Sequence, residues 1–140
     1  LVKQGDYDLG LPEINLGLLG GAGGTQRLPR LVGQSKAMEM ELLGTTISPE
    51  LAVQYDIAME CVDGDVLARA IEVANKLASK NARAAAHIKQ LIRGSAQWSL
   101  EDGLAKERTL FCDLMVSPES LEAMKDFVEN DGDIRDEDCR

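Results

Sequence analysis

Apolar residues in the second half of the chain recur at the three- and four-residue spacing that places them on one face of a helix. The clearest case follows Asp63 or Asp65, either of which is suited to begin a helix. The residues expected on its inward face are Leu67, Ala70, Ile71, Ala74, Leu77 and Ala78. This spacing predicts an amphipathic helix that packs against another part of the fold.

Three more helices are predicted from the residues that begin them. Ser99 stands three residues before Asp102, as in a capping box. Asn81 precedes an alanine-rich segment, and Ser117 is followed by a proline. For the helices after Asn81 and Ser99, the expected inward residues are Ile88, Leu91, Ile92, Leu104, Phe111, Leu114 and Met115. The acidic tail from Asp126 onward is expected to fray or to stay solvated.

The first half of the chain has a different pattern. Residues 9–24 read LGLPEINLGLLGGAGG, and their six glycines and one proline exclude a regular helix. Because this loop also contains many apolar residues, we expect it to be partly buried, as is typical of a segment that lines a site.

Helix signals dominate from residue 25 onward. Ser35 is predicted to cap a helix that ends at Leu43, with Gly44 in the left-handed conformation after it. Ser48, followed by a proline, is predicted to begin another helix. Residues 57–62 are the one clear strand candidate, so the whole pattern is a glycine-rich loop followed by about six helices and one strand.

The composition narrows the possible partners. Fifteen Lys and Arg against 24 Asp and Glu give a net charge of −9, which opposes binding to nucleic acid or to an anionic membrane surface. No apolar run approaches the ~20 residues of a membrane span. The three cysteines form no CxxC pair, so neither disulfides nor a metal site is indicated. We expect a reducing compartment: the cytoplasm or, in a eukaryote, the mitochondrial matrix.

Glu13 is the main candidate for acid–base chemistry. It stands alone between Pro12 and Ile14 in an apolar, glycine-lined segment. Loss of hydration favours the neutral form of a carboxyl group, and a carboxyl poised near neutrality can both give and take a proton. On spacing alone, however, an exposed glutamate in an ordinary turn is the simpler interpretation.

The run GGAGGT at residues 20–25 leads into a helix, so its N–H groups could converge on an oxygen or a water. It lacks the sequence of a nucleotide-binding loop. Arg27, Arg30 and Lys36 follow it and could receive an anion, although cations near a helix start are usually solvated. His87 lies mid-helix without a nearby carboxylate, which favours a packed or surface role over catalysis.

Residues 9–44 read LGLPEINLGLLGGAGGTQRLPRLVGQSKAMEMELLG, which resembles the segment FGxPExxLGxxPGxGGxQRLxRxVGxxxAxExxLxG of the crotonase family of enoyl-CoA hydratases and isomerases. Further on, TTISPELAVQYDIAMECV resembles the family's ISAxEAxxxGLVxxVV, and MVSPESLEAMKDFVEN resembles its terminal helix. Gly20 stands in place of the usual proline, and Asp56 in place of a glycine, where it would need a less favoured backbone angle. Asn130 and Asp131 stand where the family commonly has Lys and Arg, which removes cations that would meet CoA phosphates.

The resemblance implies an α/β fold, the C-terminal part of the crotonase (ClpP/crotonase-like) spiral, here mostly α-helical with few short strands. Residues 1–62 would form the end of the spiral core with the glycine-rich loop. Residues 63–140 would form a helical region that builds trimer contacts and covers the acyl-CoA site, followed by the acidic tail. A homotrimer or a dimer of trimers is expected.

The resemblance also implies chemistry on an acyl-CoA, in which CoA is part of the substrate and no separate cofactor is needed. The family stabilises the enolate of a CoA thioester with two backbone N–H groups. Glu13 matches the glutamate that exchanges a proton at the carbon next to the thioester carbonyl. Gly20 and Gly21 match the loop that positions water, and Leu19 and Phe127 match positions that contact CoA.

The reaction implied is hydration of a trans-2-enoyl-CoA by a hydratase-type lyase, as in fatty-acid β-oxidation. The family's first catalytic glutamate and the GGG segment of its oxyanion hole belong upstream and are absent from these residues. One alternative is an enoyl-CoA isomerase that uses a single glutamate. The other is a noncatalytic fragment or subunit that retains the oligomerising helices, so the activity of these 140 residues alone is left open.

Overall fold

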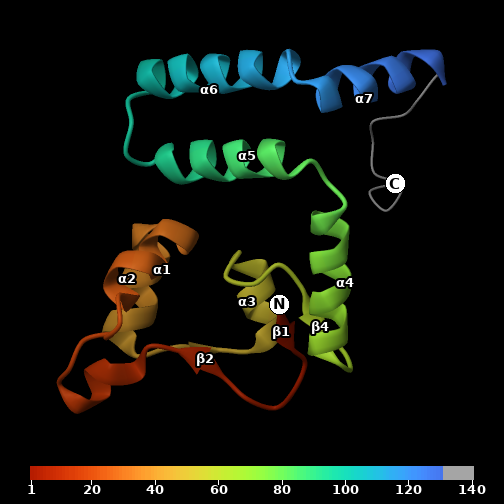
Figure 1. The fold of residues 1–140 in the computed structure, drawn as a ribbon. Helices are drawn as coiled ribbons and strands as arrows, with labels where there is room; N and C mark the ends of the chain where they lie inside the picture. Colours follow the sequence, from red (N-terminus) through yellow and green to blue (C-terminus); the bar gives the residue numbers. More distant parts are fainter. Residues whose placement is uncertain (131–140) are drawn as a thin grey trace. The chain divides into compact units, whose positions relative to one another are not determined.

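The computed structural model describes residues 1–130, whose helices and strands are labelled in Figure 1. The chain divides into two compact units, and the division falls within α4 (Val66–Ala78), after Asn75. The first unit contains β1 (Val2–Lys3), β2 (Leu9–Gly10), the 3-10 helix η1 (Pro12–Leu16), α1 (Gly24–Val32), α2 (Gln34–Leu43), β3 (Thr46–Ile47), α3 (Pro49–Gln54), β4 (Cys61–Val62) and most of α4 (Val66–Ala78). The second contains α5 (Ala82–Gly94), α6 (Leu100–Met115) and α7 (Pro118–Glu129). The predicted division into a core segment, residues 1–62, and a helical region, residues 63–140, is separate from this one and stays a prediction.

Two small sheets lie in the first unit. β1 pairs with β4 in parallel, with Val2 opposite Cys61, and β2 pairs with β3 antiparallel, with Leu9 opposite Ile47. Each strand is two residues long. Strands this short carry no alternation of apolar and polar residues, which is why β1, β2 and β3 leave no signal in the sequence.

The predicted strand at residues 57–62 is correct only at its end, β4. The N–H groups of Ile57 and Ala58 both donate to the carbonyl oxygen of Ala52, at 2.9 and 3.0 Å, so the chain turns back on α3. Asp56 adopts a φ of 57°, the less favoured angle expected at this position. A tight turn therefore replaces the start of the predicted strand.

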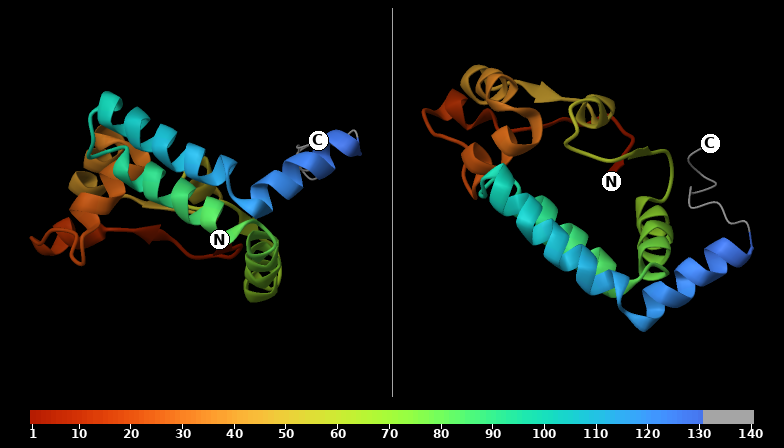
Figure 2. Two further views of the ribbon diagram at one scale, coloured as in Figure 1. Left: turned by 45° about the horizontal axis from the view of Figure 1, so that its top comes forward. Right: turned by 90° about the horizontal axis from the view of Figure 1, so that it is seen from above.

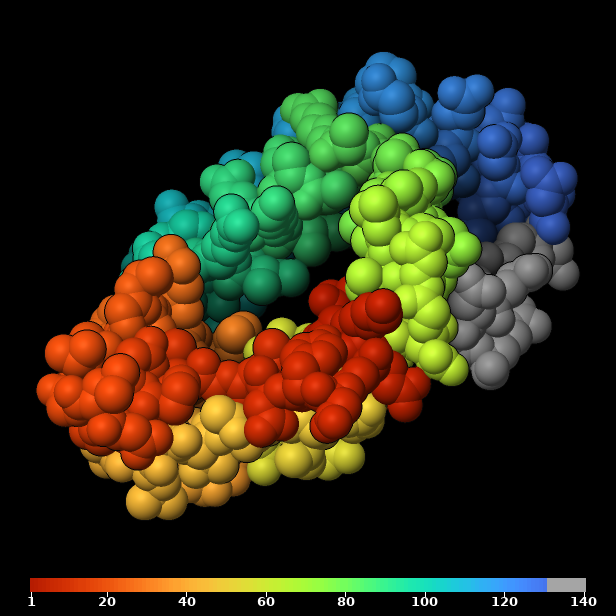
Figure 3. Space-filling view, turned by 90° about the horizontal axis from the view of Figure 1, so that it is seen from below, coloured from red at the N-terminus to blue at the C-terminus, as the bar shows by residue number. Residues whose placement is uncertain are grey.

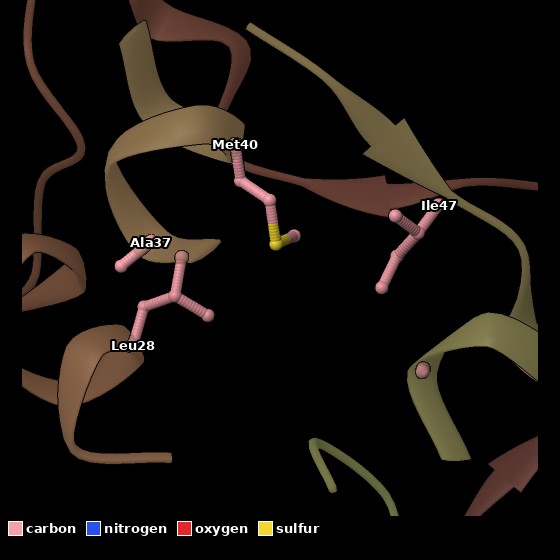
Figure 4. Packing of buried hydrophobic residues seen from close by; sticks show 5 residues of the cluster. Leu28, Ala37, Met40 and Ile47 are labelled. Carbon is pink, nitrogen blue, oxygen red and sulfur yellow. The ribbon is translucent and has the colours of Figure 1, made fainter. Parts of the chain in front are cut away.

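The core of the first unit is small and is formed by α1, α2, β3 and α3. Figure 4 shows Leu28 and Ala37 close together, with Met40 and Ile47 extending into the neighbouring space. The buried cluster consists of Leu28, Ala37, Met40, Ile47 and Ala52. The partly buried residues packed against it are Val2, Leu9, Leu11, Val32, Leu51, Tyr55, Ile57 and Ala58. Residues from both sheets thus contribute to a single core.

Polar side chains begin most of the later helices where the sequence predicts them. In each case a side-chain oxygen accepts a backbone N–H from the first turn. These caps are Ser48, Asp65, Asn81, Ser99 and Ser117. The prediction for Ser35 is wrong, because α2 begins at Gln34 and Gly33, with a φ of 80°, occupies the cap position instead. Gly44 follows α2 in the left-handed conformation, with a φ of 62°, as predicted.

In the second unit, α5 and α6 lie side by side, as both views of Figure 2 show. Arg83 at the start of α5 forms an ion pair with Asp113 of α6. Near the turn between the helices, the Trp98 ring packs directly on Gly94, where a Cβ atom would lie 2.1 Å from the ring. The ammonium group of Lys106 lies 5.1 Å from the centre of the Trp98 ring. The ion pair joins the two helices directly, and the Trp98 ring joins them through Gly94 of α5 and Lys106 of α6.

The amphipathic helices predicted from the sequence form, but residues 1–130 do not bury their apolar faces. Ile92 of α5 is 68% exposed and Phe111 of α6 is 60% exposed. Other predicted inward residues that are exposed are Leu67, Ile71, Leu77, Ile88, Leu104 and Met115. The prediction that these side chains face inward is therefore not met within the described part of the chain.

α7 continues to Glu129, so the chain does not fray at Asp126, but residues 126–130 are exposed, as expected of a segment that stays solvated. The Asn130 side-chain amide donates to the Asp126 carbonyl oxygen at 2.9 Å and closes the helix. The rest of the predicted tail, including Asp131, lies outside the described residues. Within residues 1–130, no helix is both long and apolar enough to cross a bilayer.

The substitution Gly94→Ala should displace the Trp98 ring, because the new Cβ atom would overlap it. We expect a loss of about 1–3 kcal/mol of stability. Fluorescence should shift to longer wavelength as the single tryptophan gains contact with water. Gly103→Ala in α6 is the matched control, since a Cβ there meets nothing within 4 Å, and it should add about 0.5–1 kcal/mol. Unchanged emission in Gly94→Ala would contradict the packing.

Candidate active site

Glu13 is held in the short helix η1 by the residues on either side of it. Pro12 occupies the first position, where its fixed φ suits a helix and its missing N–H has no partner to lose. Gly17 ends the helix with a φ of 70°, and the Leu18 N–H donates to the Glu13 carbonyl oxygen at 3.1 Å. A proline before and a glycine after therefore confine Glu13 to a defined turn.

The carboxyl group of Glu13 is partly buried. Its Oε2 atom is shielded from solvent and receives no hydrogen bond from residues 1–130. The same holds in this part of the chain for one other side-chain atom, His87 Nδ1 on α5. A shielded polar atom without a partner is unfavourable unless a ligand or a water supplies the missing hydrogen bond. The Oε2 atom of Glu13 therefore keeps an unused capacity to accept or share a hydrogen bond.

The helix that carries Glu13 packs against the end of α2 at a glycine. A Cβ atom on Gly44 would lie 2.7 Å from Asn15 Nδ2 and 3.1 Å from Ile14 Cγ2. The positive φ of Gly44 also disfavours any residue with a side chain. Glycine at this position thus allows η1 to lie directly on the backbone after α2.

Leu11 connects the helix η1 to the glycine-rich turn. A Cβ atom on Gly24 would lie 2.7 Å from Leu11 Cδ1, and one on Gly20 would lie 3.2 Å from the same methyl group. Gly20 is buried by this contact and by α2. Because Leu11 directly precedes Pro12, the position of the turn and the position of Glu13 are linked.

The segment 20–24 forms a tight turn that leads into α1. The Gly24 N–H donates to the Gly21 carbonyl oxygen at 2.9 Å. Ala22 and Gly23 have positive φ angles of 51° and 88°. Within residues 1–130, the N–H groups of Gly21, Ala22 and Gly23 donate to no protein acceptor, and the space beside Gly21 is open. The turn therefore presents free N–H groups, which suits an oxygen of a ligand or a water.

Of the three cations predicted to meet an anion, Arg27 lies against the glycine turn. Its guanidinium carbon is 3.5 Å from the position of a Cβ on Gly23. Lys36 donates to the Glu39 carboxylate at 2.7 Å, and this hydrogen bond raises the pKa of Lys36. Arg30 donates to a backbone carbonyl of its own helix. The predicted cluster is thus reduced to Arg27, since the other two cations bind protein groups.

The glycine-rich loop is only partly buried, as expected, and its leucines project outward. Leu16 is 80% exposed and Leu19 is 72% exposed. Figure 3 shows the first residues of the chain, in red, at the surface of the first unit. Phe127 on α7 belongs to the second unit and is 42% exposed. Contact of Leu19 and Phe127 with CoA stays a prediction, as do the roles of Glu13, Gly20 and Gly21.

Glu41 also borders the turn, although the sequence analysis does not select it. On α2 it follows Ala37 by four residues and Met40 by one, which puts it near the buried face of the helix. The Glu41 Oε2 atom lies 3.0 Å from the position of a Cβ on Gly20. The feature of the sequence that could have selected Glu41 is this spacing, which places a charged residue at an inward position of a short helix.

Comparisons with known proteins match most of the chain to one family. Residues 4–133 match the family model described as enoyl-CoA hydratase/isomerase. The chain is 40% identical over 121 residues to a 2,3-dehydroadipyl-CoA hydratase of Escherichia coli K12, covering 86% of this chain and 48% of that protein. It is 39% identical over 119 residues to a mitochondrial enoyl-CoA hydratase of Pongo abelii, and the match covers 84% of this chain and 41% of that protein. The chain therefore spans less than half the length of these two relatives.

Solved structures of similar proteins have the same fold. An enoyl-CoA hydratase from Geobacillus kaustophilus HTA426 superposes with a TM-score of 0.84 at 33% identity, covering 91% of this chain and 49% of that one. An enoyl-CoA hydratase from Bacillus anthracis gives a TM-score of 0.81 at 35% identity, covering 91% and 50%. The predicted fold class, the mostly helical C-terminal part of an α/β crotonase fold, is confirmed.

The substitution Gly44→Ala should disturb the site through η1, because the new Cβ would clash with Asn15 and would need an unfavourable φ. We expect a loss of about 1–2 kcal/mol of stability from the left-handed conformation alone. Gly21→Ala is the matched control, because a Cβ at Gly21 meets nothing within 4 Å. Thermal or urea unfolding of both variants measures the difference, and equal stabilities would contradict the close approach of η1.

Proposed function

The chain belongs to the enoyl-CoA hydratase/isomerase family, and from that premise we propose that the protein adds water across the double bond of a trans-2-enoyl-CoA thioester. The observation that carries the proposal is the shielded, unpaired Oε2 atom of Glu13. The free N–H groups of the nearby glycine turn support it. Both features suit proton transfer beside a bound water.

In the proposed reaction, the water oxygen bonds to the carbon farther from the thioester carbonyl. The electrons of the double bond move toward the carbonyl oxygen and form an enolate. Glu13, in its protonated form, then gives a proton to the carbon next to the carbonyl and regains one that originates from the water. The N–H of Gly21 would hold the water, and Leu19 and Phe127 would contact CoA.

The remaining parts of this site would come from sequence that precedes these residues in the family. We assign to that region the first catalytic glutamate and the GGG segment of the oxyanion hole, as the resemblance implies. CoA is part of the substrate in this proposal, and no separate cofactor takes part. A reducing compartment is proposed, either the cytoplasm or the mitochondrial matrix, in keeping with the free thiols of Cys61 and Cys112.

Isomerisation of an enoyl-CoA is the second candidate, and one observation favours it. Among the carboxyl groups of residues 1–130, Glu13 alone has an oxygen that is shielded from solvent and lacks a hydrogen bond. A single carboxyl group can move a proton from one carbon of the acyl chain to another. An isomerase would therefore need Glu13 and an oxyanion hole, but no second glutamate.

Replacement of Glu13 by Gln should lower the hydration rate of crotonyl-CoA by about 10²–10⁴-fold, because the amide keeps the shape but cannot transfer the proton. The assay should use the longest native polypeptide that contains these residues, with 3-enoyl-CoA isomerisation measured beside hydration. Glu39→Gln is the control, since Glu39 is paired with Lys36 on the exposed side of α2. A rate unaffected by Glu13→Gln would refute the assignment, and isomerisation without hydration would favour the second candidate.

We further propose a homotrimer or a dimer of trimers whose contacts use the apolar helical faces. Exposed residues such as Ile92, Leu104 and Phe111 support this proposal, because large uncovered apolar faces mark association surfaces. Removal of residues 99–140 should convert the oligomer to smaller species in sedimentation measurements. An unchanged mass would count against this role. Assembly in an inactive native polypeptide would favour the noncatalytic alternative.

A further inference from the structure

The helix α2 places a carboxylate near its buried face and leucines on its exposed face. Glu41 lies beside the buried residue Met40 and is itself partly buried. Leu42 and Leu43 are exposed. Glu41 takes part in no hydrogen bond or ion pair within residues 1–130. The Glu41 oxygens are not among the shielded, unpaired atoms of residues 1–130, so the carboxylate keeps contact with solvent while it borders the turn.

The carboxylate of Glu41 fills the space that a side chain at position 20 would occupy. The position of a Cβ on Gly20 is 3.0 Å from Glu41 Oε2 and 3.2 Å from Leu11 Cδ1. Gly20 is buried between these two side chains. The next residue, Gly21, has a free N–H and open space beside it. Glu41 and Leu11 therefore border the backbone immediately before the free N–H groups.

We propose that Glu41 is a positioning residue of this site, and that Gly20 and Glu41 act as one unit. The carboxylate occupies the space beside Gly20 and sets the direction of the Gly21 N–H. The negative charge of Glu41 also acts on the amide dipoles of the turn. Because Glu41 is partly buried, water screens this interaction less than it would at an exposed site. The link to catalysis rests on the proposed function, in which Gly21 holds the water. Glu41 touches no reacting atom.

Selective ¹⁵N-glycine labelling of the longest native polypeptide tests the positioning role without any activity measurement. Glu41→Gln removes the charge and keeps the volume, so the amide resonances of Gly20 and Gly21 should move. Glu39→Gln should leave them in place, because Glu39 lies on the same helix but is paired with Lys36. Unchanged glycine resonances in Glu41→Gln would overturn the proposal.

Hydration kinetics test whether the two positions act together. Gly20→Ala overfills the space and Glu41→Ala empties it, so each should lower kcat about tenfold with KM nearly unchanged. The double variant should recover most of that loss, because the new methyl group takes the vacated space. If the fold-loss of kcat in the double variant equals the product of the losses in the two single variants, the proposed coupling is overturned. If the native polypeptide does not hydrate crotonyl-CoA, the proposed function fails, and the glycine resonances still decide the role of Glu41.

Discussion

The site depends on the close approach of backbone and side chains that glycine permits at three positions. Gly44 allows η1 to lie against the end of α2, and Gly20 and Gly24 allow Leu11 to lie against the turn. These contacts leave no room for a Cβ without displacement of a neighbour. Glu13 is therefore positioned by packing around η1 rather than by hydrogen bonds to its own carboxyl group, whose shielded Oε2 receives none within residues 1–130.

A second constraint is the imbalance between the apolar side chains of the chain and the core that they form. The buried cluster around Met40 is confined to the first unit, whereas α4 to α6 expose leucines, isoleucines and Phe111. Exposed apolar faces of this extent are rare on isolated monomers. The relatives are about twice as long as the matched region, so additional sequence or additional subunits would supply the missing cover in the proposed assembly.

The sequence predicted local features well and tertiary features poorly. Caps such as Asn81 and Ser99 are local, since the side chain and the N–H that it binds lie within one helical turn. The start of the strand predicted at residues 57–62 was wrong because the Ile57 and Ala58 N–H groups donate to a carbonyl oxygen of α3, which no apolar pattern specifies. The prediction that apolar residues of α5 and α6 face inward was not met for another reason. Periodicity identifies the apolar face of a helix, but it does not specify which part of which chain covers that face.

The same distinction explains what was found at the site. Glu13 was selected first because it stands alone in an apolar, glycine-lined segment, and the resemblance supported this choice because Glu13 occupies a specified position of the family pattern. Glu41 falls on an unspecified position, and Gly20 is a departure from the pattern, so neither drew attention as a partner of the other. Their relation appears only in three dimensions, where Glu41 Oε2 takes the place of a side chain at Gly20. A position where a chain departs from its family's pattern is therefore best interpreted together with the residue that fills the space which the change opens. Close packing makes the residue types at the two positions depend on each other.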